Sequence, residues 1–345
     1  MLKPYIAQAI KREHLSAAQA EEAMNIIMTG QATPAQIGAY LIALRMKGET
    51  VDEITGSARA MRANAVRVTP TLNIGEALYD TAGTGGDGAH TFNISTAAAF
   101  IIAGTGRKVA KHGNRAASSQ CGSADVLAVL GVSLDLTPEQ VGKAIDEVGI
   151  GFLFAPKFHP AMKHAVGPRK EIGQRTIFNV LGPLTNPAGA NVQVIGVYDP
   201  ALTEPLAKVL GELGAKAAYV IHGHGGTDEL NPSGPNRMSH LKDGAVRTFD
   251  LDPAELGLAR APLADLRGGT PDDNAAIMRD VLTAKVNGAR RHAALLNAAA
   301  ALAAESGNLS IALEEARDAL DSGAALAKLN ALIDYSQAHT PKPVD

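Results

Sequence analysis

The segment GTGGDG at residues 83–88 places one carboxylate, Asp87, among four glycines. Gly83, Gly85 and Gly88 fit the spacing G-x-G-x-x-G, in which backbone amides can approach a phosphate closely. The loop follows an apolar run at residues 77–80 and precedes an expected helix. A helix N-terminus favours anions, so the segment predicts a phosphate-binding loop.

The expected helix begins near Ser95, and Asn93 and Thr96 are further capping or contact groups. The two common nucleotide motifs do not fit this loop. A dinucleotide site has an acid about 20 residues past the motif, and a P-loop ends in Gly-Lys-Ser/Thr. The next strand instead brings cations, and Gly88 is followed by Ala89 and His90.

A second cluster, KHGNRAASSQCGSAD at residues 111–125, follows an apolar run. Lys111 and Arg115 can neutralise phosphate charge, and three hydroxyls can donate hydrogen bonds to phosphate oxygens. These hydroxyls belong to Ser118, Ser119 and Ser123. Cys121 lies in the same cluster, but no residue pattern assigns it a base, and a small buried cysteine is the simpler interpretation.

Adjacent carboxylates, Asp228 and Glu229, follow the apolar run AAYVIHG. Neighbouring carboxylates repel one another unless a cation lies close by. Magnesium prefers oxygen ligands and is commonly shared between one or two carboxylates and substrate phosphates. The pair therefore predicts a magnesium site, and Asp87 would lie beside a magnesium-phosphate ligand.

A zinc site built from His222, His224 and Asp228 is an alternative, but the spacing matches none of the usual zinc motifs. The glycines between these residues favour backbone contact instead. His159, His164 and His240 receive no role from the sequence alone.

Three capping boxes predict short helices over the first 65 residues. They pair Ser16 with Gln19, Thr33 with Gln36 and Thr50 with Glu53. Apolar residues then recur at helical spacing. From about Leu72, apolar runs alternate with glycine-rich turns and helical stretches, which is typical of a mostly parallel α/β sheet with ligand loops at the strands' carboxyl ends.

We therefore predict an α/β protein with a small N-terminal helical domain and a larger α/β domain that has a mostly parallel central sheet. The helical domain is expected at residues 1–70, joined by part of 160–190, and the α/β domain at 71–345. Alanine-rich helical patterns close the chain, with two helices expected between Ser310 and about Gln337. No low-complexity linker separates the domains, so they should pack together.

Composition excludes several classes of protein. Thirty-two Lys and Arg against 35 Asp and Glu leave a formal charge of -3, so no global basic field favours nucleic acid. The apolar runs are far shorter than the roughly 20 residues of a membrane span. One cysteine and no targeting pattern predict a cytoplasmic protein without a membrane partner.

The motifs GTGGDG, NIST, KHGNRAASS, GSAD, FLFAPKFHPAMKH, RTIFNVLGPLTNP and the Asp-Glu pair occur in the order and spacing typical of anthranilate phosphoribosyltransferases. The chain resembles that family from its helical start to its last helices. The resemblance implies a nucleoside-phosphorylase-type fold, a homodimer joined through the N-terminal helices, and Mg2+ dependence. It implies transfer of 5-phosphoribosyl from 5-phosphoribosyl 1-pyrophosphate (PRPP) to anthranilate, a step toward tryptophan.

The resemblance also implies roles for individual residues. The PRPP contacts are Gly83, Gly86, Asp87, Thr91, Asn93, Ile94, Ser95, Thr96, Lys111, His112, Gly113, Asn114, Arg115, Ala116, Ala117, Ser118, Ser119 and Ser123. The magnesium contacts are Ser95, Asp228 and Glu229, and the anthranilate contacts are Gly83, Asn114 and Arg169. Lys111, Asp228 and Glu229 are the expected catalytic residues. Gln120 stands where the family often has lysine, so we expect one pyrophosphate contact or one long-range cation to be missing.

Two rival functions remain open at this point. A pyrimidine-nucleoside phosphorylase of the same fold also uses a glycine loop and a lysine-serine loop, but Asn114, Arg169 and the FHPAMKH stretch favour anthranilate. A non-catalytic relative that binds nucleic acid through a basic groove is disfavoured by the charge of -3 and by the intact pair Asp228 and Glu229.

Overall fold

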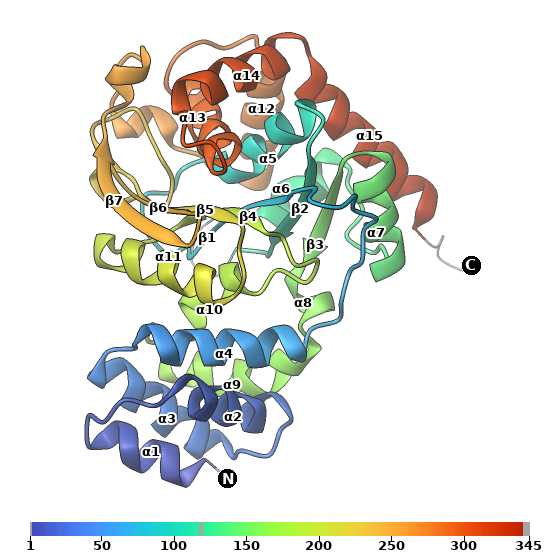
Figure 1. Ribbon diagram of the computed structural model, residues 1–345. Coiled ribbons are helices and arrows are strands. Elements are labelled where there is room, and N and C mark those ends of the chain that lie inside the picture. The colour runs from blue at the N-terminus through green and yellow to red at the C-terminus, as the bar shows by residue number, and fades with distance from the viewer. Residues whose placement is uncertain (1, 117–119, 341–345) are drawn as a thin grey trace.

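The computed structural model describes residues 2–116 and 120–340. The predicted contacts Ala117, Ser118 and Ser119 lie outside the described residues. The chain begins with four helices, α1 (Lys3–Ile10), α2 (Ala17–Met28), α3 (Pro34–Lys47) and α4 (Val51–Ala63), which form the lower part of the molecule in Figure 1. The three predicted capping boxes are present at the starts of α2, α3 and α4.

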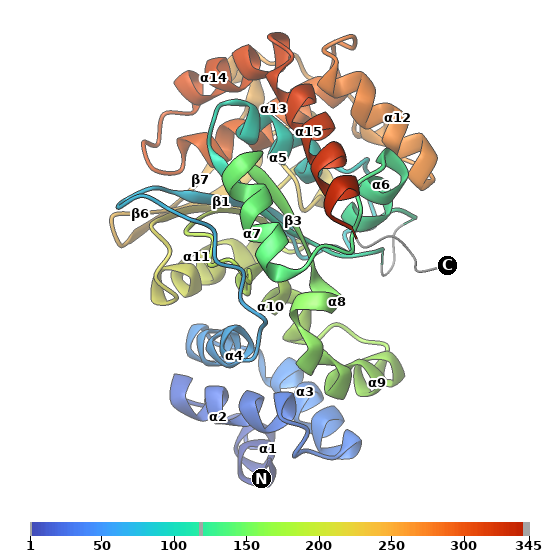
Figure 2. The same cartoon turned by 90° about the vertical axis from the view of Figure 1, so that its right-hand side faces the viewer.

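A later part of the chain returns to these helices. It contains α8 (Ala155–Phe158), α9 (Lys163–Ile172) and α10 (Phe178–Leu184). Helix α9 packs against α2 and α3, and α10 packs against α4. Figure 2 shows α8 and α10 between the sheet and the helical layer, with α9 beside α3. The segment after α8 therefore connects the two parts of the molecule.

A seven-stranded sheet forms the centre of the larger part. Its strands are β1 (Leu78–Gly83), β2 (Lys108–Gly113), β3 (Ile150–Phe154), β4 (Val192–Gly196), β5 (Ala217–His222), β6 (Asn236–Lys242) and β7 (Ala245–Leu251). The strand order is β3-β2-β1-β4-β5-β6-β7, and β1 to β5 are parallel. The predicted fold class, with its mostly parallel sheet, is confirmed.

The antiparallel hairpin of β6 and β7 was not predicted. Asp243 and Gly244 connect the two strands, and both have positive φ, 50° and 75°. Asp-Gly is the preferred pair for a two-residue hairpin turn with this conformation. The Asp-Gly pair is therefore a sequence signal for this hairpin that the prediction did not use.

Helices cover both faces of the sheet (Figure 1). Above it lie α5 (Ile94–Gly104), α12 (Pro271–Leu282), α13 (Ala289–Ala303), α14 (Leu309–Asp321) and α15 (Ala324–His339). Below it lies α11 (Thr203–Glu212), while α6 (Ser123–Leu130) packs on α12 and α7 (Pro138–Glu147) on β3. None of the described helices combines the length and apolarity that crossing a membrane requires.

One buried apolar cluster joins the helical layer to the lower face of the sheet. It includes Ile27 and Leu41 from the N-terminal helices, Leu206 from α11, and Ile195 and Val220 from the sheet. Burial of apolar side chains is the main stabilising contribution to such packing. The expected close packing of the two parts is confirmed.

The carboxyl ends of the five parallel strands meet at one edge of the sheet. Gly83 at the end of β1 pairs in register with Gly196 at the end of β4, and Gly113 of β2 pairs with Phe154 of β3. The chain order reverses between β1 and β4, and a crevice for ligands forms at such a switch point. The loops after β1, β2, β3 and β5 therefore surround one site.

Candidate active site

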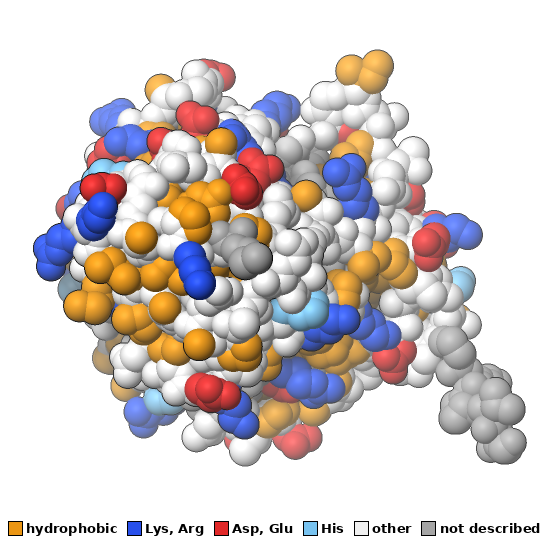
Figure 3. All heavy atoms as spheres, turned by 90° about the horizontal axis from the view of Figure 1, so that it is seen from below, with side chains coloured by type: hydrophobic (Ala, Val, Ile, Leu, Met, Phe, Trp, Pro, Cys, Tyr) orange, Lys and Arg blue, Asp and Glu red, His pale blue; other side chains and the backbone are white. Residues whose placement is uncertain are grey.

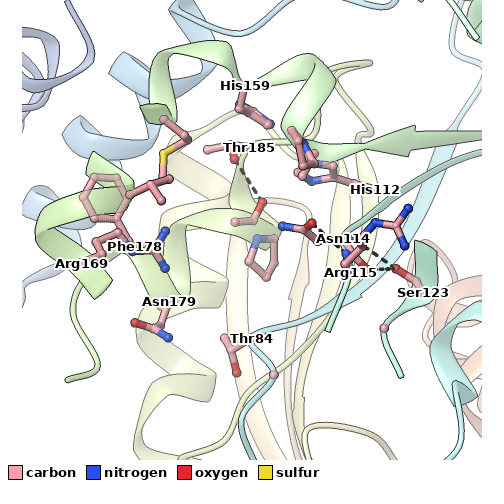
Figure 4. Close-up of a pocket in the computed structure, with 18 of the residues that line it drawn as sticks. Thr84, His112, Asn114, Arg115, Ser123, His159, Arg169, Phe178, Asn179 and Thr185 are labelled. Atoms are coloured by element: carbon pink, nitrogen blue, oxygen red, sulfur yellow. Dashed lines mark hydrogen bonds between the residues drawn. The ribbon is translucent and has the colours of Figure 1, made fainter. Parts of the chain in front are cut away.

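A cleft of about 660 Å3 lies between the loops of the sheet and the helices α8 to α10. Figure 4 shows its labelled side chains, with Asn114, Arg115 and Ser123 on one side and Arg169 with Phe178 on the other. A second cavity of about 250 Å3 lies beneath the glycine loop, and Asp228 and Glu229 line it. Gly85, Gly86 and Ser123 line both spaces, so the two adjoin.

The glycine loop is fixed at its start and open in its middle. The amide of Thr84 donates to Gly196 O at 2.9 Å, and the amide of Gly85 donates to Asp228 Oδ2 at 2.7 Å. Gly85, Gly86 and Gly88 have φ values of +66°, +71° and +76°, a conformation that glycine adopts readily.

Within the described residues, no hydrogen bond uses the amides of Gly86, Asp87 or Gly88. Unsatisfied consecutive amides form a concave site for anions, and here they stand near the N-terminus of α5. The middle of the loop therefore has the geometry to accept phosphate oxygens.

Asp87 links the glycine loop to the acidic pair. One of its oxygens accepts from the amide of Ala89 at 3.1 Å, and the other accepts from the amide of Asp228 at 3.2 Å. The carboxylate therefore holds the backbone of the Asp-Glu turn beside the loop. Its proximity to Asp228 also adds a third negative charge to the small cavity.

Asp228 and Glu229 are the most strongly perturbed acids of the site. Burial, together with repulsion from neighbouring carboxylates, raises the pKa of Asp228 and that of Glu229. Glu229 accepts hydrogen bonds from Thr91 Oγ1 and from the amide of Ser95, each at 3.0 Å. A divalent cation would relieve the repulsion between these acids.

Two glycines let the acidic turn approach the sheet. A Cβ on Gly83 would lie 2.3 Å from Asp228 Oδ2, and a Cβ on Gly196 would lie 1.5 Å from Asp228 O. Real Cβ atoms do not approach so closely, so neither position accepts a side chain without moving Asp228. The role of Gly83 in the site is close backbone approach.

The cluster after β2 separates into a buried part and an exposed part. Lys111 is 3% exposed, and its Nζ donates to the carbonyl of Thr81 at 2.5 Å. Burial lowers the pKa of Lys111, while the charges of Asp80, Glu229 and Asp228 oppose that shift. Lys111 therefore places its charge behind the acidic pair and does not line either cavity.

The exposed part of this cluster is held by Asp125. Arg115 Nη1 donates to Asp125 Oδ1 at 2.9 Å, and the amides of Ala116 and Gly122 donate to Asp125 Oδ2. The amide of Asn114 donates to Ser123 Oγ at 3.2 Å. These contacts close the loop so that Asn114, Arg115, Ala116 and Ser123 all line the large cleft.

His112 and His159 line the roof of the same cleft in Figure 4, with ring centroids 5.1 Å apart. Burial lowers the pKa of His112 to about 3 and that of His159 to about 4, although a backbone carbonyl opposes the shift in each case. Both rings are therefore neutral near pH 7. Sequence reasoning gave His159 no role, although it lies in the quoted stretch FHPAMKH.

Arg169 reaches the cleft from α9. Its Cζ lies 5.0 Å from the centroid of the Phe178 ring, and burial lowers the pKa of its guanidinium. Such a partly desolvated guanidinium can grip a carboxylate in bidentate fashion. Asn179 and Thr185 contribute further polar groups from α10 and its end.

Within residues 2–116 and 120–340, no group of three or more His, Cys, Asp and Glu side chains has the arrangement of a metal centre. This result counts against the zinc alternative at His222, His224 and Asp228. The two adjacent, partly buried carboxylates of the small cavity fit magnesium, because that ion takes only one or two protein carboxylates and fills its other positions with water and phosphate.

Most predicted site residues come together at the two cavities. The small cavity holds Gly86, Asp87, Thr91, Asn93, Ser95, Thr96, Ser123, Asp228 and Glu229. The large cleft holds Gly83, Gly86, His112, Asn114, Arg115, Ala116, Ser123 and Arg169. Ile94 and Lys111 are buried and, with Gly113, line neither cavity.

Several cleft residues were not among the predicted contacts. They include Met61, Thr84, His159, Met162, Lys163, Val166, Phe178, Asn179 and Thr185. Met61 comes from the N-terminal helices, and only the fold brings it to the cleft. The others belong to, or lie close to, the motifs that carried the family resemblance. The resemblance therefore indicated these segments but did not predict which of their side chains line the cleft.

Two family profiles match the chain. The one described as "Glycosyl transferase family, helical bundle domain" matches residues 3–65, and the one described as "Glycosyl transferase family, a/b domain" matches residues 75–326. The anthranilate phosphoribosyltransferase of Moorella thermoacetica is 56% identical over 340 residues, covering 98% of this chain and 99% of the relative. That of Symbiobacterium thermophilum is 54% identical over 337 residues, covering 97% and 98%.

Solved structures agree with these matches. The anthranilate phosphoribosyltransferase of Thermus thermophilus superimposes with a TM-score of 0.91 at 44% identity, covering 96% of this chain and 99% of that one. The Saccharomyces cerevisiae enzyme in complex with PRPP and Mg gives 0.88 at 30% identity and covers 98% of each chain. The same yeast enzyme in complex with 4-fluoroanthranilate gives 0.86 at 28% identity, again with 98% of each chain covered.

Proposed function

The chain belongs to the anthranilate phosphoribosyltransferase family, and on this premise we propose the reaction that its two adjoining cavities carry out. The protein transfers the 5-phosphoribosyl group of PRPP to the amine of anthranilate, giving N-(5'-phosphoribosyl)anthranilate and pyrophosphate. It is a pentosyltransferase of tryptophan biosynthesis. This proposal rests mainly on one observation: the glycine loop and the pair Asp228 and Glu229 line a cavity that adjoins the cleft lined by Arg169.

The small cavity and the glycine loop form the donor site. The free amides of Gly86, Asp87 and Gly88 and the N-terminus of α5 face phosphate oxygens. Thr91, Asn93 and Thr96 add polar side chains along the same wall. The yeast relative in complex with PRPP and Mg supports this donor.

Asp228 and Glu229 hold Mg2+, together with Ser95 and the phosphates of the donor. The raised pKa of each carboxyl supports this role, because a bound cation would stabilise the ionised forms of two acids that repel one another. When bound, Mg2+ supplies positive charge against the leaving pyrophosphate.

The large cleft holds anthranilate. Arg169 pairs with its carboxylate, while Asn114 and the backbone at Gly83 contact it near the donor. The neutral His112 and His159 and the ring of Phe178 give this cleft a weakly polar surface that suits an aromatic ring. The yeast relative in complex with 4-fluoroanthranilate supports this class of acceptor.

The chemistry requires stabilisation of the leaving group more than a strong base. The aryl amine is neutral near pH 7 and already nucleophilic, so it attacks C1 as the C1-oxygen bond to pyrophosphate breaks. Attack from the face opposite the leaving group inverts C1. The loop amides and the buried charge of Lys111 stabilise the negative charge that develops on pyrophosphate, and the two cavities align the substrates.

The native assembly is a cytoplasmic homodimer joined through the N-terminal helices. Helices α1 and α3 pack together, and each exposes a large apolar side chain, Ile10 at 67% and Met46 at 73%. Hydrophobic side chains gather over this face of the molecule in Figure 3. Residues 1–70 with part of 160–190 constitute the dimerising domain, and 71–345 the catalytic domain.

Product balance tests the reaction against its nearest rival. Purified protein with anthranilate, PRPP and Mg2+ should release one pyrophosphate for each anthranilate consumed. Thymidine with inorganic phosphate should give no sugar 1-phosphate under the same conditions. Phosphorolysis of thymidine without consumption of anthranilate would identify a nucleoside phosphorylase instead.

A further inference from the structure

Arg175 lies in the connector between α9 and α10, outside every residue set assigned above. One of its guanidinium nitrogens donates a hydrogen bond to the carbonyl of Gly86. Its Cζ lies 3.9 Å from the centroid of the Tyr198 ring, the shortest such distance among the described cation-π pairs. A guanidinium stacked on an aromatic ring has a fixed plane, so its hydrogen bond is well directed.

Three neighbouring residues of the glycine loop are each held by a different part of the fold. Thr84 accepts from the amide of Tyr198 at 3.2 Å, and Gly85 donates to Asp228. Gly86 accepts from Arg175. The last contact is the only one of the three made by a cation, and the only one that comes from the segment between α9 and α10.

The contact at Gly86 determines the direction of the next amide. In a trans peptide the C=O and the N–H point in opposite directions. Because the carbonyl of Gly86 points toward Arg175, the amide of Asp87 points away from it. That amide is one of those left free among the described residues, and Asp87 lines the small cavity.

Arg175 also contributes charge behind the loop. Among the described residues, no carboxylate oxygen lies within 4 Å of its guanidinium nitrogens, so its charge is not neutralised by an ion pair. A positive charge hydrogen-bonded to a carbonyl polarises the peptide and strengthens the donor at its other end. This effect favours anion binding at the loop.

We propose that Arg175, stacked on Tyr198, is a positioning residue that orients the glycine loop for the phosphates of the donor. The connector is flanked by Arg169 in α9 and Phe178 at the start of α10, which pack together at the acceptor cleft. Arg175 therefore ties the donor loop to the segment that binds the acceptor. This inference rests on the proposed function.

Steady-state kinetics with both substrates test the inference. In Arg175→Ala, the KM for PRPP should rise about tenfold, the effect expected from loss of one hydrogen bond with a charged donor. The KM for anthranilate should change less than twofold. Tyr198→Leu keeps the backbone contact to Thr84 but removes the stacking ring, so the KM for PRPP should rise by a smaller factor.

One control variant and two rescue experiments separate a positioning role of Arg175 from a general loss of structure. Arg247→Ala removes an exposed arginine that lies 6.0 Å from the Phe249 ring on β7, and both KM values should stay unchanged. Arg175→Lys keeps a cation that can donate to Gly86, and millimolar ethylguanidinium can occupy the space in Arg175→Ala. Either should recover part of the PRPP affinity without altering the KM for anthranilate.

Wild-type turnover separates failure of the proposed reaction from failure of the role proposed for Arg175. No turnover by folded wild-type protein would remove the proposed function. With an active wild type, an unchanged KM for PRPP in Arg175→Ala would overturn the role of Arg175 alone. Equal increases in both KM values, with no recovery by lysine or ethylguanidinium, would also overturn it, because a local unfolding of the connector gives that pattern.

Discussion

Asp228 and Glu229 lie next to one another in the interior, with Asp87 close by, and backbone amides or hydroxyls donate to each of these acids. Such donors soften the repulsion between the carboxylates but do not remove it, because the pKa of both members of the pair stays raised. A cation that binds here would interact with acids already in place. The site is therefore arranged for metal before the donor arrives.

Replacing both acids with neutral isosteres should impair metal use. Asp228→Asn with Glu229→Gln keeps the size of the side chains but removes two negative charges, so turnover should fall and the concentration of Mg2+ for half-maximal rate should rise. Titration of Mg2+ at saturating PRPP measures this. Glu314→Gln, on the surface of α14, is the matched control. Unchanged magnesium dependence in the double variant would remove the pair from the metal site.

Arg169 should act on one substrate. Arg169→Ala removes the guanidinium proposed to bind the anthranilate carboxylate, so the KM for anthranilate should rise far more than the KM for PRPP. A loss of one charged, bidentate contact corresponds to about tenfold or more. Lys170→Ala, the exposed neighbour, should leave both constants unchanged. Equal losses for the two substrates would contradict the assignment.

His159 should impose a pH dependence on stability. Its pKa is about 4 in the folded protein and near 6.5 when unfolded, so the unfolded chain binds more protons between these values. The stability that neutral His159 contributes is present above about pH 6.5 and is lost as the pH falls toward about 4. His159→Gln lacks this titration.

Denaturant unfolding of the two proteins at several pH values measures the difference. Relative to the wild type, the variant should gain about 2 kcal/mol in free energy of unfolding between about pH 7 and about pH 5. Comparing the two proteins cancels the titration of buried groups that do not contact His159, such as Asp80. Parallel pH curves would show that the His159 ring is not buried in its neutral form.

At the scale of elements, the glycine loop depends on the close approach of two strand ends to the acidic turn. Gly83→Ala would place a methyl group against Asp228 Oδ2, at 2.3 Å in the unchanged backbone. Either the loop or the carboxylate must move. We expect turnover to fall at least about tenfold, since small displacements of catalytic groups have effects of this order.

Gly38→Ala is the comparison for this prediction. Gly38 lies within α3, and an added Cβ would meet nothing within 4 Å, so activity should be unchanged. Initial rates at saturating substrates and Mg2+ measure both variants. Wild-type activity in Gly83→Ala would show that the approach of β1 to the acidic turn is not required.

Local sequence signals predicted several helices well, but they could not predict contacts between segments that are far apart in the chain. The capping boxes are properties of four consecutive residues, so Thr50 and Glu53 could be paired from the sequence. The contact of Arg175 with Gly86 joins residues 89 positions apart and depends on where the segment between α9 and α10 lies relative to the glycine loop. No periodicity or motif in the sequence predicts a contact between these two residues.

The buried position of Lys111 shows the same limit. Its motif predicted a cation beside the donor phosphates, but β2 is covered on both faces, so Lys111 and His112 are both buried although their side chains leave opposite faces of the strand. The resemblance to known enzymes indicated the loop, and only the folded structure shows which members of the loop line the cavities.

At the scale of the whole molecule, the helical layer and the sheet share one apolar cluster and enclose the cleft between them. Residues from both parts line it, such as Met61 of α4 and Asn114 after β2. A change in how the two parts pack would therefore alter the acceptor cleft. The dimer interface proposed above lies on the helical layer, where Ile10 and Met46 are exposed.

A charge on that face should disrupt the proposed dimer. Met46→Glu places a carboxylate at an exposed apolar position of α3, which is unfavourable if the residue becomes buried on association. Light scattering coupled to size-exclusion chromatography should report a dimer for the wild type and a monomer for the variant. Ile311→Glu, equally exposed on α14, should remain dimeric. If the Met46→Glu variant remains dimeric, the interface does not include Met46.

The most direct test of the central claim is the time course of anthranilate fluorescence with the purified, folded protein. We predict that fluorescence decays when PRPP and Mg2+ are both present and stays constant when either is omitted. Such a result would establish donor, acceptor and metal in one experiment. Constant fluorescence with all components present, from protein whose folding circular dichroism verifies, would contradict the assignment of the two cavities to PRPP and anthranilate.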